Sequence, residues 1–237
     1  TFEQLVSTSS LCTPALSTTP TTPTPRARGR VADMHQQGPE QLAARLPQKP
    51  YDTWTESERR FGNLAAFLTL RRLDGREAPP TEAEQRILRA WSGWGGVDFA
   101  KIPRDPEILT DDYLRAFDAW DALREGKSGS TEDASLLQGV VNQFFTPMWV
   151  VRAMWRLAMR AMPATGYKAA LEPSAGSGRF LEGAPATVAD AEWCVVEWDR
   201  LGAQVLRHSY ARSNVHVFEA PFEGFVAGAL PKKVAWD

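Results

Sequence analysis

The strongest constraint on the fold comes from residues 168–180, where a short apolar run leads into a turn with two closely spaced glycines. The run ends in an acid and a proline, and a segment able to form a helix follows the turn. A strand, a glycine turn and a helix in this order are typical of sheets that bind nucleotides. Gly176 and Gly178 let the backbone turn sharply and approach a ligand closely. A dinucleotide loop would place a third small residue at position 181, which is Leu, so the spacing disfavours NAD and favours another adenosine-containing cofactor.

Strand-forming and helix-forming segments alternate from residue 168 onward. Strands are predicted at 168–172, 192–197 and 215–218, and a fourth strand is predicted to begin at 233–237. Helical segments separate the strands, which is the pattern of a parallel sheet with helices on both faces. We therefore predict an α/β, Rossmann-like fold preceded by a helical N-terminal region. The sheet is expected to be incomplete, because the chain ends as its fourth strand begins.

The N-terminal part is predicted to divide into a tail and a helical region. A stretch rich in Ser, Thr and Pro cannot bury enough apolar surface to offset chain entropy, so the tail is expected to be disordered, with a weakly helical piece at 38–46. Capping boxes at 55–58 and 81–84 predict the starts of two helices. The predicted division is a disordered tail at 1–50, a helical leader at 51–135 and the N-terminal half of a cofactor-binding domain at 136–237.

Residues 91–97 form a glycine-dense corner that contains two tryptophans, Trp91 and Trp94. One interpretation is a tight turn from helix to loop, with both indoles packed on the core. The other is an aromatic platform for nucleic acid. We favour packing, because burial is the common fate of aromatic side chains.

A second organising element is the segment 142–147, which ends in Thr146 and Pro147. Thr146 is predicted to be the N-cap of the following helix and Pro147 its first residue. The helix N-terminus offers free amides and partial positive charge that suit an anion. One side of this helix is predicted to be apolar. A row of arginines at four-residue spacing lies along its flank and is interpreted as a solvated face. The apolar stripe comprises Val151, Met154, Trp155, Ala158, Met159 and Met162, and the row comprises Arg152, Arg156 and Arg160.

Ligands of open parallel sheets bind beyond the carboxyl ends of the strands. Glu197 ends the second predicted strand, where an acid can accept hydrogen bonds from both ribose hydroxyls, although Asp199 or Glu197 could instead cap the next helix. Phe222, or the pair at 218–219, could hold an adenine by stacking and a hydrogen bond. A purely structural turn explains these residues equally well.

Composition narrows the classes of function. The formal net charge of −2 argues against a uniformly basic surface for nucleic acid. The two cysteines and three histidines are scattered, so no disulfide framework or metal site is predicted, and a reducing cytoplasm is the expected location. No apolar run is long enough to span a bilayer and no secretory signal opens the chain. The first residue, Thr1, suggests a fragment or a trimmed product.

The motifs as a set resemble adenine-specific (N6) DNA methyltransferases. Leu-Glu-Pro-Ser-Ala-Gly-Ser-Gly-Arg-Phe at 171–180 resembles their S-adenosylmethionine loop, and Phe-Phe-Thr-Pro at 144–147 resembles their N-terminal cofactor motif. The order of motifs matches that family through 142–237, and the segment at 92–96 looks like part of the leader of large phage- and plasmid-borne methylase-helicase proteins. The resemblance implies S-adenosylmethionine as cofactor, double-stranded DNA as partner in a restriction or anti-restriction context, and a fused or associated helicase. The implied cofactor-binding residues are Phe145, Thr146, Pro147, Glu172, Pro173, Ala175, Gly176, Gly178, Phe180, Glu197 and Phe222.

The same resemblance implies that the catalytic residues lie elsewhere. In the family an Asn/Asp-Pro-Pro-Tyr/Phe tetrad follows the fourth strand, so it is expected beyond Asp237, and this chain alone is expected to be inactive. An alternative is a non-catalytic, methyltransferase-like module that binds DNA for an attached helicase. A third, methylation of RNA or protein, is disfavoured by the Phe-Thr-Pro segment.

Overall fold

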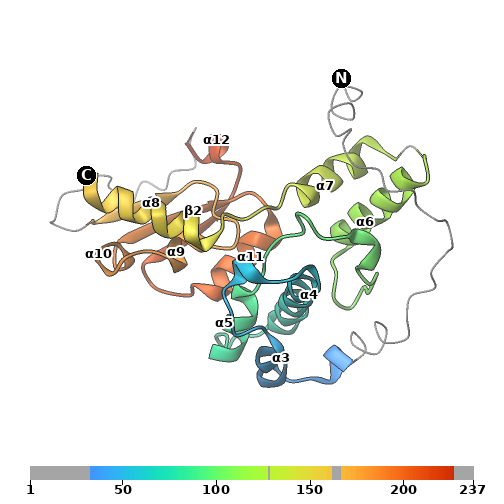
Figure 1. The fold of residues 1–237 in the computed structure, drawn as a ribbon, viewed down its shortest axis with the longest axis horizontal. Helices are drawn as coiled ribbons and strands as arrows, with labels where there is room; N and C mark the ends of the chain where they lie inside the picture. Colours follow the sequence, from blue (N-terminus) through green and yellow to red (C-terminus); the bar gives the residue numbers. More distant parts are fainter. Residues whose placement is uncertain (1–32, 128, 162–166, 227–237) are drawn as a thin grey trace.

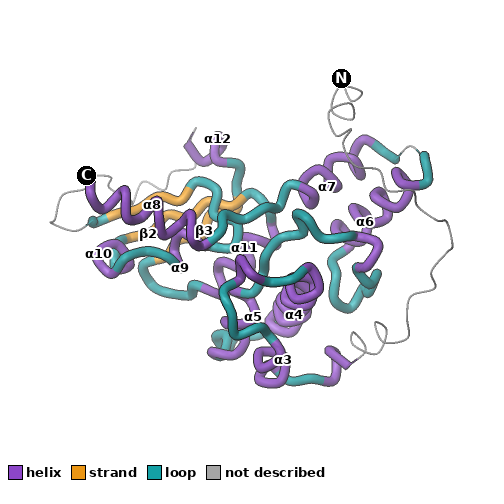
Figure 2. The backbone as a smooth tube through the Cα atoms, viewed as in Figure 1, coloured by secondary structure: helices purple, strands orange, loops and turns teal. Residues whose placement is uncertain are grey.

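The computed structural model describes residues 33–127, 129–161 and 167–226, which form a helical half and a sheet half (Figure 1, Figure 2). The helical half contains α3 (Pro39–Arg45), η1 (Tyr51–Thr53), α4 (Glu56–Leu73), α5 (Glu82–Arg89), η2 (Phe99–Lys101), α6 (Asp111–Arg124) and α7 (Thr131–Val141). The sheet half contains α8 (Met148–Ala161), β1 (Ala169–Glu172), α9 (Arg179–Glu182), α10 (Ala186–Ala189), β2 (Glu192–Glu197), α11 (Arg200–Ser209), β3 (Val215–Glu219) and α12 (Phe222–Gly224). None of the described helices is long and apolar enough to cross a membrane.

Both predicted capping boxes are confirmed. The hydroxyl oxygens of Thr55 and Thr81 accept hydrogen bonds from the amides of Glu58 and Glu84, each at 3.3 Å. The two glutamate side chains accept in return from the threonine amides, at 2.7 and 2.8 Å. These reciprocal bonds satisfy amides that would otherwise be unpaired, and they fix the starts of α4 and α5.

The predicted tail was too long. The helical piece predicted at 38–46 is confirmed as α3, but residues 33–50 are not a disordered tail, because Met34, Leu42 and Leu46 are buried in the same core as α4 and α5. The apolar residues of this stretch are few, but they fall on the side of the chain that meets α5. The remaining residues of the predicted tail, 1–32, lie outside the described residues.

The tryptophan corner packs on the core, as the structural interpretation predicted. Trp91 and Trp94 are fully buried, and both rings contact Phe67 of α4, with ring centroids 5.3 and 5.9 Å away. Gly93 takes a positive φ of 72°, and a Cβ there would lie 2.2 Å from the carbonyl oxygen of Gln143. Because Gly93 has no Cβ, the backbone of the corner can lie directly against the backbone of Gln143, in the segment before α8.

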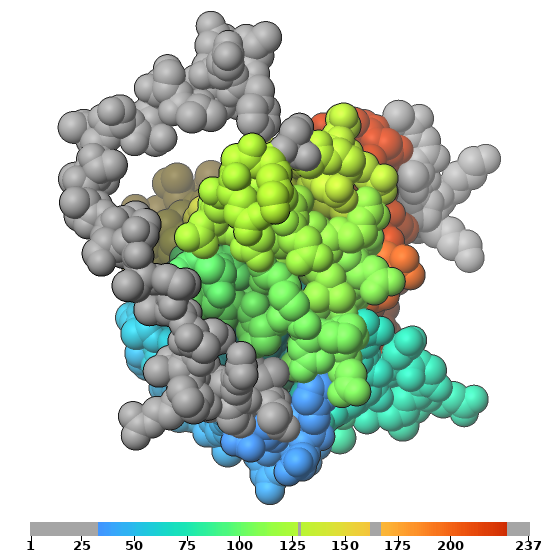
Figure 3. Space-filling model, turned by 90° about the vertical axis from the view of Figure 1, so that its right-hand side faces the viewer, coloured from blue at the N-terminus to red at the C-terminus, as the bar shows by residue number. Residues whose placement is uncertain are grey.

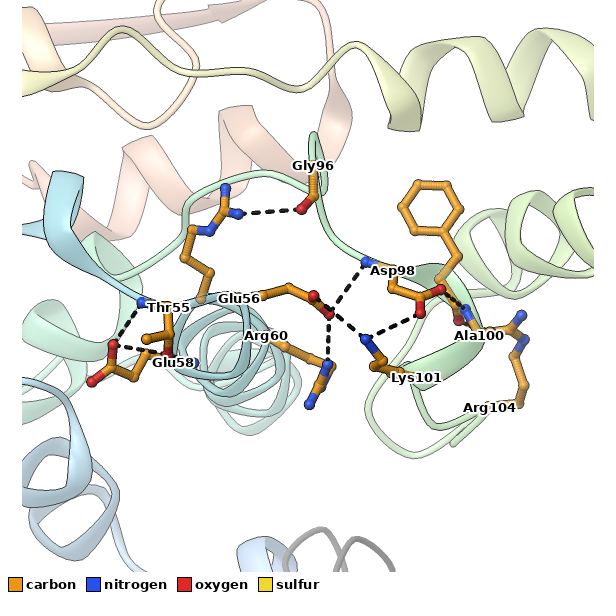
Figure 4. A network of polar contacts seen from close by, with 11 residues as sticks. Thr55, Glu56, Glu58, Arg60, Gly96, Asp98, Ala100, Lys101 and Arg104 are labelled. Carbon is orange, nitrogen blue, oxygen red and sulfur yellow. Dashed lines mark hydrogen bonds and ion pairs between the residues drawn. The ribbon is translucent and has the colours of Figure 1, made fainter. Parts of the chain in front are cut away.

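Polar groups tie this corner to α4. The buried Asn63 amide donates to the Gly93 carbonyl at 2.8 Å and its oxygen accepts from the Ser92 amide and hydroxyl at 2.9 Å. At the surface, Glu56 accepts from Arg60 and from the Asp98 amide, while Arg59 donates to the Gly96 carbonyl (Figure 4).

Farther along the chain, α6 and α7 pack against each other and form one face of the molecule (Figure 3).

The sheet is parallel with strand order β1-β2-β3, which confirms the three predicted strands that lie in the described residues. The predicted fourth strand at 233–237 lies outside them. Alternate side chains of β2 point to opposite faces. Trp193 and Val195 pack with residues of α8 and α11, and the other face of the strand is covered by Phe225.

Helix α11 belongs to both halves of the molecule. Leu201 and Val205 are part of the core of the helical half, whereas Leu206 and Tyr210 are part of the core of the sheet half. The helical leader is therefore packed on the sheet half through a shared helix. The carboxyl ends of β1 and β2 consequently face the helical half.

The start and the buried side of α8 differ from the prediction. The Pro147 carbonyl accepts from the amides of Val150 and Val151 at 3.0 and 3.1 Å, so the predicted cap Thr146 is one residue too early. Met154 was placed in the apolar stripe but is 50% exposed, because α8 packs on the sheet half through the side that carries Val151 and Trp155. The last member of the predicted stripe, Met162, lies outside the described residues.

We expect Asn63→Leu to destabilise the protein by about 2–4 kcal/mol, since it leaves a buried amide and a buried carbonyl without partners. Ser92→Ala is the matched control, because it removes one of these hydrogen bonds and should cost only about 1 kcal/mol. Urea denaturation of the two variants measures both free energies of unfolding. If both variants lost the same free energy of unfolding, the hydrogen bonds of Asn63 would not be what stabilises the tryptophan corner.

Candidate functional site

A cleft of about 1130 Å³ lies between the carboxyl ends of β1 and β2 and the helices α4, α6 and α7. Its volume is slightly above the range of about 300–1,000 Å³ found for small-molecule sites. Seven predicted cofactor-binding residues line it: Phe145, Thr146, Glu172, Ala175, Gly176, Phe180 and Glu197. Four predicted residues do not: Pro147, Pro173, Gly178 and Phe222. The cleft thus gathers most of the predicted site from three separate segments of the chain.

The two glycines of the turn serve different contacts. Gly176 has a φ of 53°, and a Cβ there would lie 2.7 Å from the ring of Phe145. Gly178 has a φ of 78°, and a Cβ there would lie 2.5 Å from the ring of Tyr210. The Tyr210 hydroxyl also donates to the Gly178 carbonyl at 3.1 Å. Gly176 therefore lets the Phe-Thr-Pro segment close on the turn, whereas Gly178 lets the turn pack on α11.

Glu197 joins the turn to the end of β2. One carboxylate oxygen accepts from the Gly176 amide at 2.6 Å, and the other accepts from the Asp199 amide at 2.8 Å. Asp199 is the N-cap of α11 and accepts from the Gly202 amide at 2.7 Å, so the capping role belongs to Asp199. Glu197 is left facing the glycine turn within the cleft.

The helical half reaches this acid pair through Tyr113 of α6. The Tyr113 hydroxyl donates to the Asp199 carboxylate at 3.3 Å and accepts from the side-chain amide of Gln143 at 2.8 Å. Burial raises the pKa of Tyr113 well above its usual value, so the phenol stays protonated and acts as the donor. One buried hydroxyl thus links α6, the start of α11 and the segment before α8.

Three carboxyl groups at the cleft are poorly hydrated. The pKa of Glu172 is raised to about 7, chiefly by burial and also by the negative charge of Glu197, although the hydrogen bond from the Ser174 amide opposes the shift. Burial also raises the pKa values of Glu197 and Asp199, with backbone amides acting in the opposite direction. Donors such as hydroxyl or amine groups of a ligand would relieve this desolvation.

The N-terminus of α8 already has an anionic partner in the chain. The Met148 amide donates to the Asp52 carboxylate of η1 at 3.1 Å. The expectation that this end of α8 is open to a ligand anion is therefore corrected: a carboxylate from ninety-six residues upstream lies there. Thr146 and Phe145, just before it, still line the cleft.

Phe222 lies outside the cleft, whereas Trp198, which was not predicted as a site residue, lines it. Phe222 stacks on Phe225, with ring centroids 6.5 Å apart, and does not line the cleft. Trp198 follows Glu197 directly, is 72% exposed and does line the cleft. The signal was present in the sequence, since a residue that follows an acid at a strand end lies on the same rim. No pattern in the sequence of α4, α6 or α7 indicated that these helices line the cleft.

One other cluster of polar side chains involves His35. Its ring nitrogens lie 2.9 Å from Asp105 and 3.4 Å from Glu107, within a set whose donor atoms all lie within 4.8 Å of one another. Each nitrogen faces a different carboxylate. A single metal ion could use only one of the two nitrogens. These residues do not line the cleft.

No protein family, curated protein sequence or solved structure matches this chain. The case for any function therefore depends on the residues of the cleft.

We expect Glu172→Gln to remove a pH dependence of stability. Because the folded state holds a proton that the unfolded state releases near pH 4.5, this carboxyl makes stability fall as pH rises from about 4.5 to about 7. The variant should thus be more stable than the wild type at pH 8, by at most about 3 kcal/mol, and by much less at pH 5. Urea denaturation across this range measures the difference. The exposed Glu223→Gln is the control, and a pH-independent effect of Glu172→Gln would contradict the assignment.

Proposed function

We propose that the chain carries the cofactor-binding half of an S-adenosylmethionine-dependent DNA adenine N6-methyltransferase. The observation that carries the proposal is the bond between Glu197 and the Gly176 amide, inside a cleft that Phe145 and Thr146 also line. In the same cleft, the close approach of Gly176 to the Phe145 ring joins the two motifs on which the resemblance depends. The third position of a dinucleotide loop is Leu181, which packs into the core of the sheet half, so NAD is not favoured.

The cleft offers groups that would suit each part of the cofactor. Glu197 would accept hydrogen bonds from the ribose hydroxyls, and the Trp198 indole would stack on the adenine. Phe145 and Thr146 would contact the methionine end. When bound, the cofactor supplies an electrophilic methyl group on a sulfonium. The residues of this chain would hold and orient it.

The alternative is a non-catalytic, methyltransferase-like module that binds DNA for an attached helicase. Such a module would retain the shape of the cleft without using it for methyl transfer. One observation favours this alternative. Both carboxylate oxygens of Glu197 already accept hydrogen bonds from amides of the chain itself. Each oxygen retains a further lone pair, so ribose binding is compatible with both bonds. Direct measurement of cofactor binding separates the two proposals.

We expect the chain to bind S-adenosylmethionine or S-adenosylhomocysteine, and to bind either at least tenfold more tightly than NAD. Isothermal titration calorimetry with the three ligands at one pH measures the affinities. The chain alone should not transfer methyl groups to adenine-containing DNA. Tighter binding of NAD would overturn the cofactor assignment, and a chain that binds none of the three would favour the non-catalytic module.

We expect Trp198→Ala to weaken cofactor binding by about five- to a hundredfold, because a base stacked on an aromatic side chain contributes about 1–3 kcal/mol. Trp198 is exposed, so the substitution should leave the free energy of unfolding almost unchanged. Phe222→Ala is the matched control and should change affinity less than twofold, since Phe222 lies outside the cleft. The reverse result would restore Phe222 as the adenine contact.

A further inference from the structure

A second pocket of about 360 Å³ shares residues 143–145 with the cleft and is otherwise lined by different residues. Its walls come from η1, the start of α4, the tryptophan corner and the start of α8. The volume lies within the range of about 300–1,000 Å³ found for ligand sites. Glu172, Glu197 and Asp199 do not line this pocket, so it is separate from the proposed cofactor site.

The lining of this pocket is rich in aromatic side chains. Five of the residues that line it are aromatic: Tyr51, Trp54, Phe144, Phe145 and Trp149. Phe144 and Trp149 are 68% and 67% exposed, although large aromatic side chains are usually buried. The indole N–H of Trp149 has no hydrogen-bond partner among the described residues. Aromatic grooves with free donors bind polyproline II segments, because proline rings pack on the aromatic faces and the carbonyls of such segments lack internal partners.

A carboxylate at the same pocket is open to a basic partner. Asp52 is exposed, one of its oxygens accepts from the Met148 amide at 3.1 Å, and it forms no ion pair with any residue that the structure describes. The other charged residue of the lining, Arg59, donates to the carbonyls of Gly95 and Gly96 at 3.3 and 3.2 Å. Charge complementarity therefore favours an occupant that carries a basic residue beside its apolar part.

The chain itself contains a segment with both properties. Pro20, Pro23 and Pro25 are followed directly by Arg26, in a tract that lies outside the described residues. A polyproline II helix has 3 residues per turn and rises about 3.1 Å per residue, so Pro20 and Pro23 fall on one edge, about 9 Å apart. Arg26 comes one turn later on the same edge. Because proline fixes φ in advance, such a tract loses less entropy on binding.

The tract is close enough to the pocket to reach it. The described chain begins at Asp33, and the Met34 carbonyl accepts from Arg72 at the C-terminal end of α4, at 3.2 Å. Arg59 lies 13 residues before Arg72 in α4, which is about 20 Å along the helix axis. The seven residues from Arg26 to Asp33 span about 23 Å when extended. The tract can therefore bind while Met34 stays in the core.

We propose that residues 20–26 of this chain bind the second pocket as a polyproline II segment. Pro20 and Pro23 pack on the aromatic side chains, and Arg26 pairs with Asp52. A tethered tract has an effective concentration of about a millimolar, so it outcompetes the same tract of a second copy. Because Phe145 lines both the pocket and the cleft, the bound tract holds in place the segment that closes on the glycine turn. The proposal does not depend on the proposed function.

The test uses the whole 237-residue chain and a fluorescein-labelled synthetic peptide with the sequence of residues 18–30. In the wild type the tethered tract occupies the pocket, so the peptide must compete with it. We expect Pro20→Ala/Pro23→Ala in the chain to raise the affinity for the peptide at least tenfold, because it frees the pocket. Pro14→Ala is the matched control outside the tract and should leave the affinity within twofold. Fluorescence anisotropy measures binding.

The pocket is tested in the chain whose own tract has been weakened. Trp149→Ala should reduce its affinity for the peptide at least fivefold, whereas Trp198→Ala, an exposed indole outside this pocket, should change it less than twofold. Asp52→Asn removes the charge but keeps an acceptor for the Met148 amide, and should weaken binding about three- to tenfold. With a peptide that carries Arg26→Ala, Asp52→Asn should cost nothing further, since the pair is already lost.

Four results would overturn the proposal. They are equal affinity of the wild type and the Pro20→Ala/Pro23→Ala variant for the peptide, no binding of the peptide to that variant, equal losses from Trp149→Ala and Trp198→Ala, and a wild-type dimer in light scattering that the proline substitutions dissociate. The last result would assign the pocket to the tract of a second copy. Cofactor titrations are not needed for any of these decisions, so failure of the cofactor assignment leaves the test intact.

Discussion

The geometry of the cleft depends on the partly buried carboxylate of Glu197. Glu197 ends β2 and accepts amide hydrogen bonds from the glycine turn on one side and from the start of α11 on the other. Burial of this group is unfavourable, as its raised pKa shows, and the two amides offset part of that cost. The turn is therefore held in place by a charge that still has acceptor capacity. A site built in this way favours ligands that bring hydrogen-bond donors.

The two halves of the molecule form the cleft together. Helix α11 contributes apolar side chains to both cores, and Tyr113 of α6 binds the acid that caps α11. The cleft is lined on one side by α4, α6 and α7 and on the other by the strand ends and the loops that follow them. The helical leader is thus a wall of the candidate site. It does more than connect the tail to the sheet.

Local signals predicted local structure well. The capping boxes fixed two helix starts, the apolar alternation located three strands, and the glycine spacing identified a turn that faces a cleft. The failures involve partners distant in sequence. No pattern near Pro147 indicates that Asp52 binds the end of α8, and Met34 joins the core only because α3 folds back onto α5. Phe222 was predicted to lie in the cleft and Trp198 was not, because strand periodicity gives a rim position but does not give the direction of a side chain after the strand ends.

Contacts between aromatic rings lead from the turn to the centre of the helical half. Gly176 meets the ring of Phe145, Phe145 lies edge-on to Trp91 at 6.2 Å, and Trp91 lies 5.9 Å from Trp94. A rearrangement of the turn must move Phe145, because the backbone leaves no space between them. The electronic surroundings of two fully buried indoles would change with it. We therefore expect a change in the state of this loop, which itself holds no tryptophan, to alter the near-ultraviolet dichroism of these two indoles.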